Sequence, residues 1–343
     1  MPSVLTDLFA WLVIAAFLVG ASFEWLQRRS AAGLRQSGRG WLAALSDRLS
    51  SAGVDPARAT TAAAWALFAA FWLVLFPHFA FTQKSYVEGV LALAAVPACL
   101  YAGWLLWNGR DSLFVLSRAV AAMGLVYLPF ETIPSFTVAG VHVPAPKRVL
   151  ILTVTEQTGF VIRLLGYHPE RVEGPVLGYM NAYQFTTAGG HKLLFEILLA
   201  CTGLGSMAIF VGLIAAVRAP LARKLRALAV SIPVIWALNL VRTTFIGVTF
   251  GNQYLQVFVD EVLFLFGSDN VYKVSYFVAD RILSQVLAVV ALVGITYLVV
   301  RELPELLTVV EDVLYLLTNE EYDLRSQVDP AHDAAADSGS QRL

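Results

Sequence analysis

Long apolar windows alternate with short polar segments along most of the chain. A bilayer core takes about 20 apolar residues in helix, because lipid offers no partner for backbone polar groups. Seven windows meet this length: residues 4–26, 57–78, 86–107, 112–133, 193–217, 225–250 and 275–300. The pattern predicts an all-α polytopic membrane protein with about seven transmembrane helices, in which residues 1–300 form a single helical domain.

The basic residues of the short connections predict the orientation of these helices. Cytoplasmic loops carry an excess of Lys and Arg. Such residues fall between helices one and two, three and four, and five and six: Arg28, Arg29, Arg35, Arg39, Arg48, Arg110, Arg218, Arg223, Lys224 and Arg226. We therefore expect the N-terminus outside and the C-terminus in the cytoplasm.

Three regions lie beyond the spans, one of which is a second outer segment over residues 251–274. Residues 134–192 form a large outer loop rich in Pro and Gly, with an amphipathic helix over 147–165 that we place on or near the membrane surface. We expect this helix to help admit a substrate. Residues 301–343 begin with leucines at helical spacing and turn acidic after Asn319, which predicts a cytoplasmic amphipathic helix and a disordered tail.

Composition narrows the class of function. Hydrophobic residues make up 58% of the 343 residues and charged residues 14%, with a formal net charge of −1. This charge gives no basic field for nucleic acid. The metal, redox and nucleotide motifs HExxH, CxxC, Walker A and GxGxxG are absent from the sequence. We expect no nucleic-acid partner, no metal and no cofactor.

Three reactive or charged side chains fall at one depth of the predicted bundle. Arg242 lies about two turns before the outer end of the sixth window, and Arg281 about two turns after the outer start of the seventh. Cys201 lies about two turns into the fifth window from its outer end. Ionisable residues within spans cost about 2.5 to 3.5 kcal/mol each, so their coincidence in depth points to a site.

Each of these residues also has a structural interpretation. Arg242 and Arg281 could pair with Glu131, Glu196 or Asp280, in the outer halves of their helices. We expect Arg118, near the cytoplasmic end of the fourth window, to extend to the lipid headgroups.

The remaining alternatives concern Cys99 and the class of function. Cys99 is interpreted as a packing residue. A transporter or flippase for an anionic solute, with Arg242 and Arg281 as binding charges, is the alternative to an enzyme.

The surroundings of Cys201 favour chemistry. Thr202, Gly203 and Gly205 follow it, and glycine lets another chain approach closely. An apolar site raises the pKa of a thiol, whereas a nearby permanent cation favours the thiolate. Arginine suits the stabilisation of a thiolate and of a developing oxyanion.

Three motifs over residues 189–300 resemble those of the exosortase and archaeosortase family of multi-pass membrane transpeptidases. They are Cys201-Thr202-Gly203, Asn239-x-x-Arg242 and Asp280-Arg281, one on each of three successive helices. Arginine in the third motif is similar to the archaeal branch, since bacterial members generally have His there. The long outer loop and the acidic tail resemble members from halophilic archaea.

The resemblance implies an enzyme of the cell membrane whose active site faces the extracellular side. Its substrates would be exported proteins, such as surface-layer glycoprotein, that end in a Pro-Gly-Phe motif, a hydrophobic helix and a basic end. Cys201 would form an acyl-thioester, and a membrane lipid would accept the new C-terminus. Arg242 would act as proton donor or thiolate stabiliser and Arg281 as transition-state stabiliser, with Thr202, Gly203, Asn239 and Asp280 in support.

Overall fold

The computed structural model describes residues 4–31, 55–82, 86–187 and 189–324, and the chain divides into two compact units. Unit 1 comprises Met1–Leu125, Val211–Ala227 and Val300–Leu343, and unit 2 comprises Val126–Phe210 and Leu228–Val299. Four helices run from one unit into the other: α5 (Leu113–Thr132), α7 (Leu204–Ala216), α8 (Leu221–Asn252) and α11 (Ser284–Glu302).

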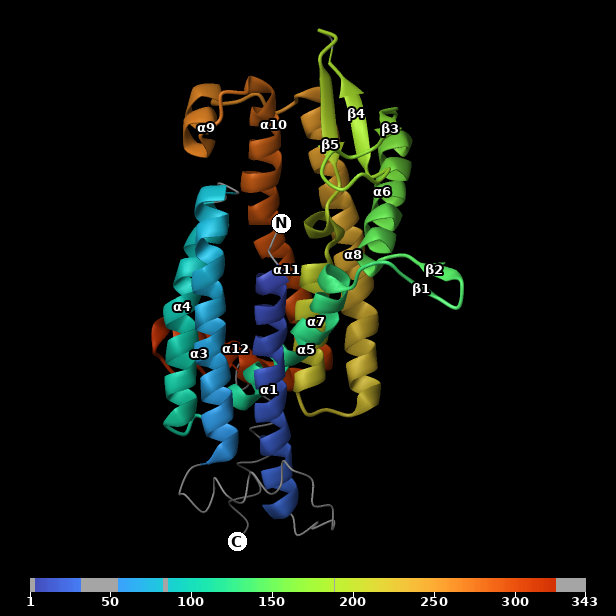
Figure 1. Ribbon diagram of the computed structural model, residues 1–343. Coiled ribbons are helices and arrows are strands. Elements are labelled where there is room, and N and C mark those ends of the chain that lie inside the picture. The colour runs from blue at the N-terminus through green and yellow to red at the C-terminus, as the bar shows by residue number, and fades with distance from the viewer. Residues whose placement is uncertain (1–3, 32–54, 83–85, 188, 325–343) are drawn as a thin grey trace. The chain divides into compact units, whose positions relative to one another are not determined.

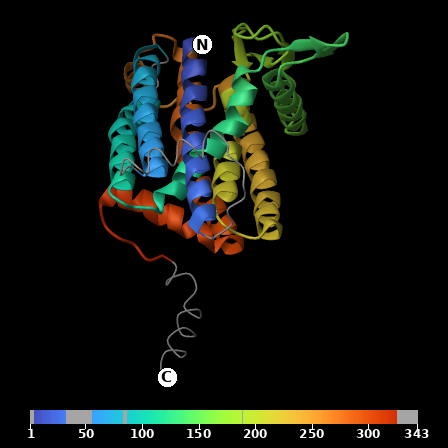
Figure 2. The same cartoon turned by 60° about the horizontal axis from the view of Figure 1, so that its bottom comes forward.

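Unit 1 is built on α1 (Val4–Ala31), α3 (Pro56–Pro77) and α4 (Tyr86–Trp107), which run side by side in Figures 1 and 2. A π-helical turn, His78–Thr82, extends α3. Asp55 caps α3, because its carboxylate accepts hydrogen bonds from the backbone N–H groups of Ala57 and Arg58. The sequence thus marks the start of α3 with an N-cap and a proline.

Small residues and aromatic rings form the core of unit 1. Gly103 faces Trp65, and a Cβ at this glycine would stand 3.1 Å from the Cβ of Trp65. The indole Nε1 of Trp65 donates a hydrogen bond of 2.9 Å to Ser117 Oγ on α5. Phe17 packs edge-on against Trp65, with their ring centroids 5.2 Å apart. Cys99 is buried in this same core, in agreement with its interpretation as a packing residue.

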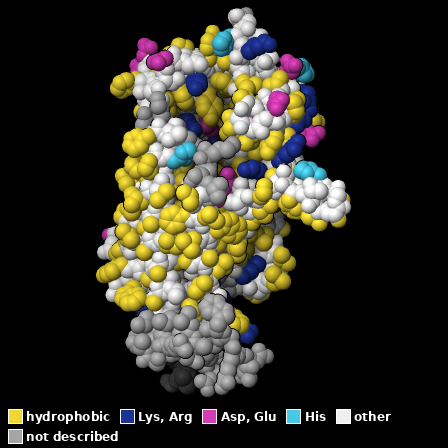
Figure 3. All heavy atoms as spheres, in the orientation of Figure 1, with side chains coloured by type: hydrophobic (Ala, Val, Ile, Leu, Met, Phe, Trp, Pro, Cys, Tyr) yellow, Lys and Arg dark blue, Asp and Glu magenta, His cyan; other side chains and the backbone are white. Residues whose placement is uncertain are grey.

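The described part of the chain contains six helices long and apolar enough to cross a membrane: Leu5–Arg29, Pro56–Thr82, Glu88–Trp107, Leu113–Thr132, Leu221–Asn252 and Val271–Glu302. In Figure 3 the surface over α3 and α4 is mostly hydrophobic, and its exposed side chains include Leu73, Leu91 and Trp104. Such a surface is stable against lipid rather than water. The prediction of a helical, multi-pass membrane protein is confirmed.

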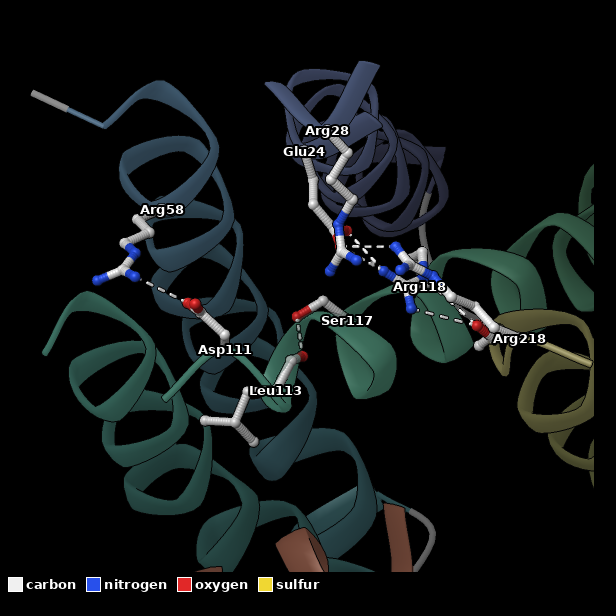
Figure 4. A network of polar contacts seen from close by, with 9 residues as sticks. Glu24, Arg28, Arg58, Asp111, Leu113, Ser117, Arg118 and Arg218 are labelled. Atoms are coloured by element: carbon white, nitrogen blue, oxygen red, sulfur yellow. Dashed lines mark hydrogen bonds and ion pairs between the residues drawn. The ribbon is translucent and has the colours of Figure 1, made fainter. Parts of the chain in front are cut away.

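A buried ion pair, instead of a headgroup contact, holds Arg118. Its guanidinium donates to both carboxylate oxygens of Glu24 at 2.7 and 2.6 Å, and to the carbonyl of Ala216. Figure 4 shows the Arg28 and Arg118 side chains directed at Glu24. The expectation that Arg118 extends to the headgroups is therefore wrong, because Glu24 on α1 supplies a partner that hydropathy does not show.

The amphipathic segment near the C-terminus is helical. A 3₁₀ turn, Pro304–Leu306, leads into α12 (Leu307–Thr318), which Figure 2 shows lying across one end of α4. Arg110, after α4, donates to Asp312 of α12 at 3.0 Å and stacks on Tyr315. Of the acidic tail predicted after this helix, residues 325–343 lie outside the described residues, as do Arg35, Arg39 and Arg48.

Unit 2 contains the predicted outer loop, which folds into strands and one helix. β1 (Phe136–Val138) and β2 (Val141–Val143) form a hairpin, and β3 (Glu170–Val172), β4 (Ala182–Thr186) and β5 (Lys192–Glu196) form an antiparallel sheet in that order. α6 (Pro146–Leu164) matches the amphipathic helix predicted over 147–165. It lies beside the sheet in Figure 1, and the hydroxyl of Tyr183 on β4 donates to its Thr155 carbonyl at 2.7 Å.

The fifth apolar window is the one that the structure corrects. The apolar pattern predicts a helix over 193–217, whereas β5 occupies its start, a 3₁₀ turn covers Leu199–Thr202, and α7 begins only at Leu204. Within β5, Leu193 and Phe195 are buried while Leu194 is exposed. This alternation belongs to a strand, and side-chain burial in the sheet outweighs the apolar average of the window.

The buried core of unit 2 joins the sheet to the helices that continue from it. Its members come from α6, β4, β5 and the residue that follows it, α8 and the segment after α10 (Val274–Tyr276): Val154, Ile162, Tyr183, Phe185, Leu193, Phe195, Ile197, Ile246, Val248, Phe250 and Ala279. Cys201 packs against this core. The outer loop and the apolar helices of unit 2 therefore share one interior, at whose edge the cysteine lies.

Candidate functional site

Cys201 lies in a 3₁₀ turn that two neighbouring residues shape. Thr202 is fully buried, and its hydroxyl donates to the carbonyl of Leu199 at 2.7 Å and accepts from the backbone N–H of Leu204. Gly203 has φ +75°, in the left-handed region, so the chain turns there into α7. The Cys-Thr-Gly motif thus places the thiol at the start of an apolar helix. The predicted position of Cys201 two turns inside a helix is wrong.

Two side chains of α8 fix the backbone of Cys201. The amide of Asn239 donates to the carbonyl of Cys201 at 2.8 Å, and the hydroxyl of Thr243 reaches the same oxygen at 3.2 Å. Asn239 also lies so close to Gly203 that a Cβ there would stand 2.9 Å from its Cγ. Because Arg242 stands between Asn239 and Thr243 on one helix, the same contacts fix the helical turn that carries Arg242.

Asp280 connects the two arginines of the site. Arg242 Nη2 donates to Asp280 Oδ1 at 2.7 Å, and Arg281 Nε lies 3.6 Å from Asp280 Oδ2. All three side chains are largely buried. Asp280 and Arg281 belong to a π-helical segment, Phe277–Leu283, and such segments occur often at functional sites. Arg242 thus pairs with Asp280, whereas the Glu196 carboxylate accepts from the backbone N–H groups of Val176 and Leu177.

The charges of this cluster act on the thiol. Cys201 precedes α7 and lies outside the six spanning helices. Burial raises the pKa of its thiol above the ordinary value, and the Asp280 carboxylate raises it further. A backbone hydrogen bond at Leu198 and the positive charges of Arg242 and Arg281 lower that pKa. The arginines thus oppose the effect of burial, as a site that uses a thiolate requires.

The outer loop is part of the surroundings of Cys201. α6 packs against the 3₁₀ turn that carries the thiol. Gln157 of α6 accepts a hydrogen bond of 2.9 Å from the indole of Trp236 on α8, three residues before Asn239. α6 is thereby held between the sheet and the helix that carries two motif residues. It presents an exposed apolar row at Phe160 and Leu164.

The structure brings together the residues that the sequence singled out. Cys201, Thr202, Gly203, Asn239, Arg242, Asp280 and Arg281 all lie in unit 2 and are joined by the contacts described above. Sequence reasoning missed Thr243 and Tyr276. Thr243 follows Asn239 by one helical turn, which is a signal for a shared face. The hydroxyl of Tyr276 is hydrogen-bonded to Asp280, one turn further along its own helix.

Among the described residues, no group of three or more His, Cys, Asp or Glu side chains is placed to hold a metal ion. The cluster around Cys201 consists of one thiol, two guanidinium groups, one carboxylate and the polar side chains that position them. The cluster can therefore provide a nucleophile, the thiol, and permanent positive charge, the two guanidinium groups. Such a combination suits acyl transfer, in which an anionic intermediate forms beside the nucleophile.

Comparison with known proteins gives concordant relatives. Residues 5–273 match the family described as transmembrane exosortase (Exosortase_EpsH). Archaeosortase A of Haloferax volcanii is 57% identical over 328 residues, which cover 96% of this chain and 99% of the relative. Archaeosortase A of Natronomonas pharaonis is 42% identical over 321 residues, 91% of this chain and 89% of the relative. No solved structure matches.

The family match spans most of the chain and includes the first two motifs of the site, while the two relatives extend over nearly all of it. The resemblance inferred from Cys201-Thr202-Gly203, Asn239-x-x-Arg242 and Asp280-Arg281 is thus confirmed at the level of the family. The chain belongs to the transmembrane exosortase family.

Proposed function

We propose that this chain is a membrane cysteine transpeptidase that cleaves a C-terminal sorting signal of the Pro-Gly-Phe type from exported surface proteins, with surface-layer glycoprotein as the expected substrate. The reaction proceeds through an acyl-thioester on Cys201, and a membrane lipid receives the new C-terminus. The observation that carries the proposal is the attachment of Cys201 to the helical turn of Arg242, which is itself paired with Asp280.

In the first half-reaction the Cys201 thiolate attacks the carbonyl carbon of the scissile peptide bond. A C–S bond forms, and the carbonyl oxygen becomes an oxyanion that Arg281 stabilises. Arg242 stabilises the thiolate before attack and orients the leaving nitrogen. When the C–N bond breaks, the proton lost by the thiol ends on the amine of the departing C-terminal helix.

In the second half-reaction a nucleophilic group of a membrane lipid attacks the thioester. A new bond forms between this group and the acyl carbon, the C–S bond breaks, and the proton of the lipid group returns to sulfur. Asp280 contacts both arginines, so it holds the two guanidinium groups in one arrangement through both steps. No external oxidant or reductant is needed.

Several observations support this proposal. Both roles proposed for the arginines need permanent positive charge, which guanidinium groups keep at any physiological pH. The relatives of highest identity given above bear the name archaeosortase A. Membership in a family of membrane processing enzymes also fits a substrate that is itself tethered in the bilayer. We place the active site toward the extracellular side, because the sheet and α6 belong to the predicted outer loop.

The test compares two cysteine variants in cells that produce the full-length protein. We expect Cys201→Ala to abolish removal of the C-terminal helix from an exported protein that ends in the sorting signal. The matched control is Cys99→Ala, which removes the other cysteine of the chain, buried in the core of unit 1. It is expected to retain processing. Both variants are first checked for normal abundance in the membrane fraction.

Intact-mass analysis of the exported protein gives the readout. The expected masses are those of the truncated chain plus a lipid with the active enzyme, and of the full chain with Cys201→Ala. Continued processing by Cys201→Ala would refute the thiol mechanism. It would leave the alternative of a transporter or flippase for an anionic solute, in which Arg242 and Arg281 only bind charge.

A further inference from the structure

A second polar cluster lies in unit 1 and contains none of the motif residues of the candidate site. Its centre is Glu24 of α1, whose side chain is 6% exposed. Three arginines lie within ion-pair distance of its carboxylate: Arg118 at 2.6 Å, Arg28 at 2.6 Å and Arg218 at 3.8 Å. They come from α5, from the next turn of α1 and from the connection between α7 and α8.

The charges of this cluster do not balance. One carboxylate faces three guanidinium groups, and Arg118 contacts both of its oxygens. Burial and then the positive charges of Arg28 and Arg118 lower the pKa of Arg218, while Glu24 raises it. Among the described residues, Glu24 is the acidic group that this trio shares. A surplus of positive charge therefore remains beside it.

The surplus charge is on the two exposed members. The side chain of Arg28 is 46% exposed and that of Arg218 is 63% exposed, whereas Arg118 is largely buried. A guanidinium group has five N–H donors, and Arg28 and Arg218 each use Nη2 toward the same oxygen of Glu24. Each of the two side chains therefore has further N–H donors besides Nη2. Two such forks side by side match the oxygens of a phosphate group.

The location of the cluster points to a lipid as the source of that phosphate. The span Leu5–Arg29 ends with Arg28 and Arg29, and Arg218 stands three residues before α8 begins. Trp25, half-exposed one residue after Glu24, carries the Arg29 guanidinium 3.7 Å from its ring centroid. Tryptophan beside arginine at the end of a span is typical of the headgroup level.

Neighbouring arginines of unit 1 provide a contrast. Arg223 is paired with Glu305, and Arg226 lies 3.7 Å from Glu302. Each of these pairs is neutral. Arg226 is 66% exposed, nearly the same as Arg218, and its distance to a carboxylate is also nearly the same. The two residues differ mainly in the number of arginines that share the acid.

We propose that Arg28 and Arg218 bind the phosphate of one anionic membrane phospholipid, and that the Glu24–Arg118 pair holds them in position. Arg118 also contacts the carbonyl of Ala216, at the end of α7. A headgroup bound by both Arg28 and Arg218 would therefore link α1 to the segment between α7 and α8. The bound lipid is a ligand distinct from the lipid that accepts the acyl group, since none of these residues belongs to the candidate site.

The test measures lipid binding to the purified full-length protein by native mass spectrometry. Delipidated protein is titrated with phosphatidylglycerol, which is anionic, or phosphatidylcholine, which is zwitterionic, at one ionic strength. We expect the wild type to retain one phosphatidylglycerol at least tenfold more tightly than phosphatidylcholine. The variant Arg28→Gln with Arg218→Gln is expected to lose at least tenfold in affinity for phosphatidylglycerol, and Arg226→Gln less than twofold.

Three results would overturn the proposal. They are equal binding of the two lipids, unchanged binding by the double variant, and displacement of phosphatidylglycerol by millimolar inorganic phosphate, which would indicate a site for a free anion. If circular dichroism shows that the double variant is misfolded, Arg218→Gln alone replaces it. Because this side chain is mostly exposed, the fold should persist, and an affinity equal to that of Arg226→Gln would again contradict the proposal.

Discussion

Gly203 determines how the chain leaves Cys201. Its positive φ and its closeness to Asn239 both disfavour a side chain at this position, which leads to a first prediction. A side chain at φ +75° is strained, and its Cβ would press on Asn239. Gly203→Ala should therefore displace the carbonyl of Cys201 from Asn239 and lower the rate of processing by on the order of a hundredfold, the cost of a misplacement of about 1 Å. The measurement is the rate of substrate cleavage in membranes.

Gly205 is the matched control for this prediction. It lies two residues further along, in α7, where a Cβ would meet no atom within 4 Å. Gly205→Ala should keep processing close to normal, since Ala favours a helix over Gly by about 1 kcal/mol. Equal losses in the two variants would show that the apolar helix as a whole, rather than the turn at Cys201, is sensitive to substitution.

Arg242 should affect the ionisation of the thiol as well as turnover. Because its positive charge lowers the pKa of Cys201, Arg242→Gln should raise that pKa and leave less thiolate at a given pH. The rate of alkylation of Cys201 by iodoacetamide, measured against pH in a Cys99→Ala background, should then rise at higher pH than in the parent. Superimposable pH profiles would mean that Arg242 does not act on the thiol.

Arg242→Lys separates charge from geometry. Lysine keeps the positive charge but cannot reproduce the planar fork that contacts Asp280. We expect the pH profile of Cys201 alkylation in this variant to stay near that of the parent, while the rate of substrate processing is mostly lost. This residue pair also illustrates what sequence can predict. The motifs identified Arg242 and Asp280, whereas Thr243 was missed because a threonine in an apolar helix has an ordinary packing explanation.

Among the elements, α6 offers a test of how the substrate reaches the site. One face of α6 is buried in unit 2, and Phe160 and Leu164 form an exposed apolar row on another. If the row contacts the hydrophobic helix of the substrate, Phe160→Ser with Leu164→Gln should lower processing severalfold and leave thermal stability unchanged, because neither side chain packs in the core. The initial rate at limiting substrate is the measurement.

The control for the α6 variant is the hairpin of β1 and β2. Val138 and Val141 are exposed to a similar degree, and their replacement by Ser removes comparable apolar surface from the same unit. We expect this hairpin variant to process substrate normally. Normal processing by the α6 variant would exclude a role of its exposed row in admitting the substrate.

The connection of α1 to α5 depends on a buried carboxylate, which allows a prediction on stability. Removing one partner of a buried ion pair leaves the other charge uncompensated and costs about 3 to 5 kcal/mol. Glu24→Gln should thus lower the unfolding midpoint in detergent clearly. Glu302→Gln, which removes a partly exposed partner of Arg226, should change it little. If Glu24→Gln and Glu302→Gln unfold at the same midpoint, solvent or lipid compensates the positive charge of Arg118.

The elements also show where hydropathy is sufficient and where it fails. The windows at 57–78, 86–107 and 112–133 differ from α3, α4 and α5 by a residue or so at each end, because in lipid a helix satisfies every backbone group internally. The window at 193–217 fails because the run Leu193-Leu194-Phe195 is as apolar as a span. Its alternating burial arises only through pairing with β4, which an average over the window cannot detect.

For the whole molecule, the sequence predicts the class of protein more firmly than the site. Composition and window length are enough for a multi-pass helical protein. The gathering of Cys201, Arg242 and Arg281 was inferred from equal depth in three helices, although Cys201 precedes its helix. In the structure, Gly203 turns the chain into α7, and hydrogen bonds from Asn239 and Thr243 hold the Cys201 carbonyl against the turn of α8 that carries Arg242.

The central proposition is that Cys201 carries the substrate as a thioester, and mass spectrometry of the enzyme tests it most directly. Protein purified with a sorting-signal substrate, under conditions that withhold the lipid acceptor, is digested and its peptides are weighed. We predict that the peptide with Cys201 gains the mass of the truncated substrate and loses it on treatment with hydroxylamine. Cleavage of the substrate with Cys201 unmodified, or an adduct on another residue, would contradict the account.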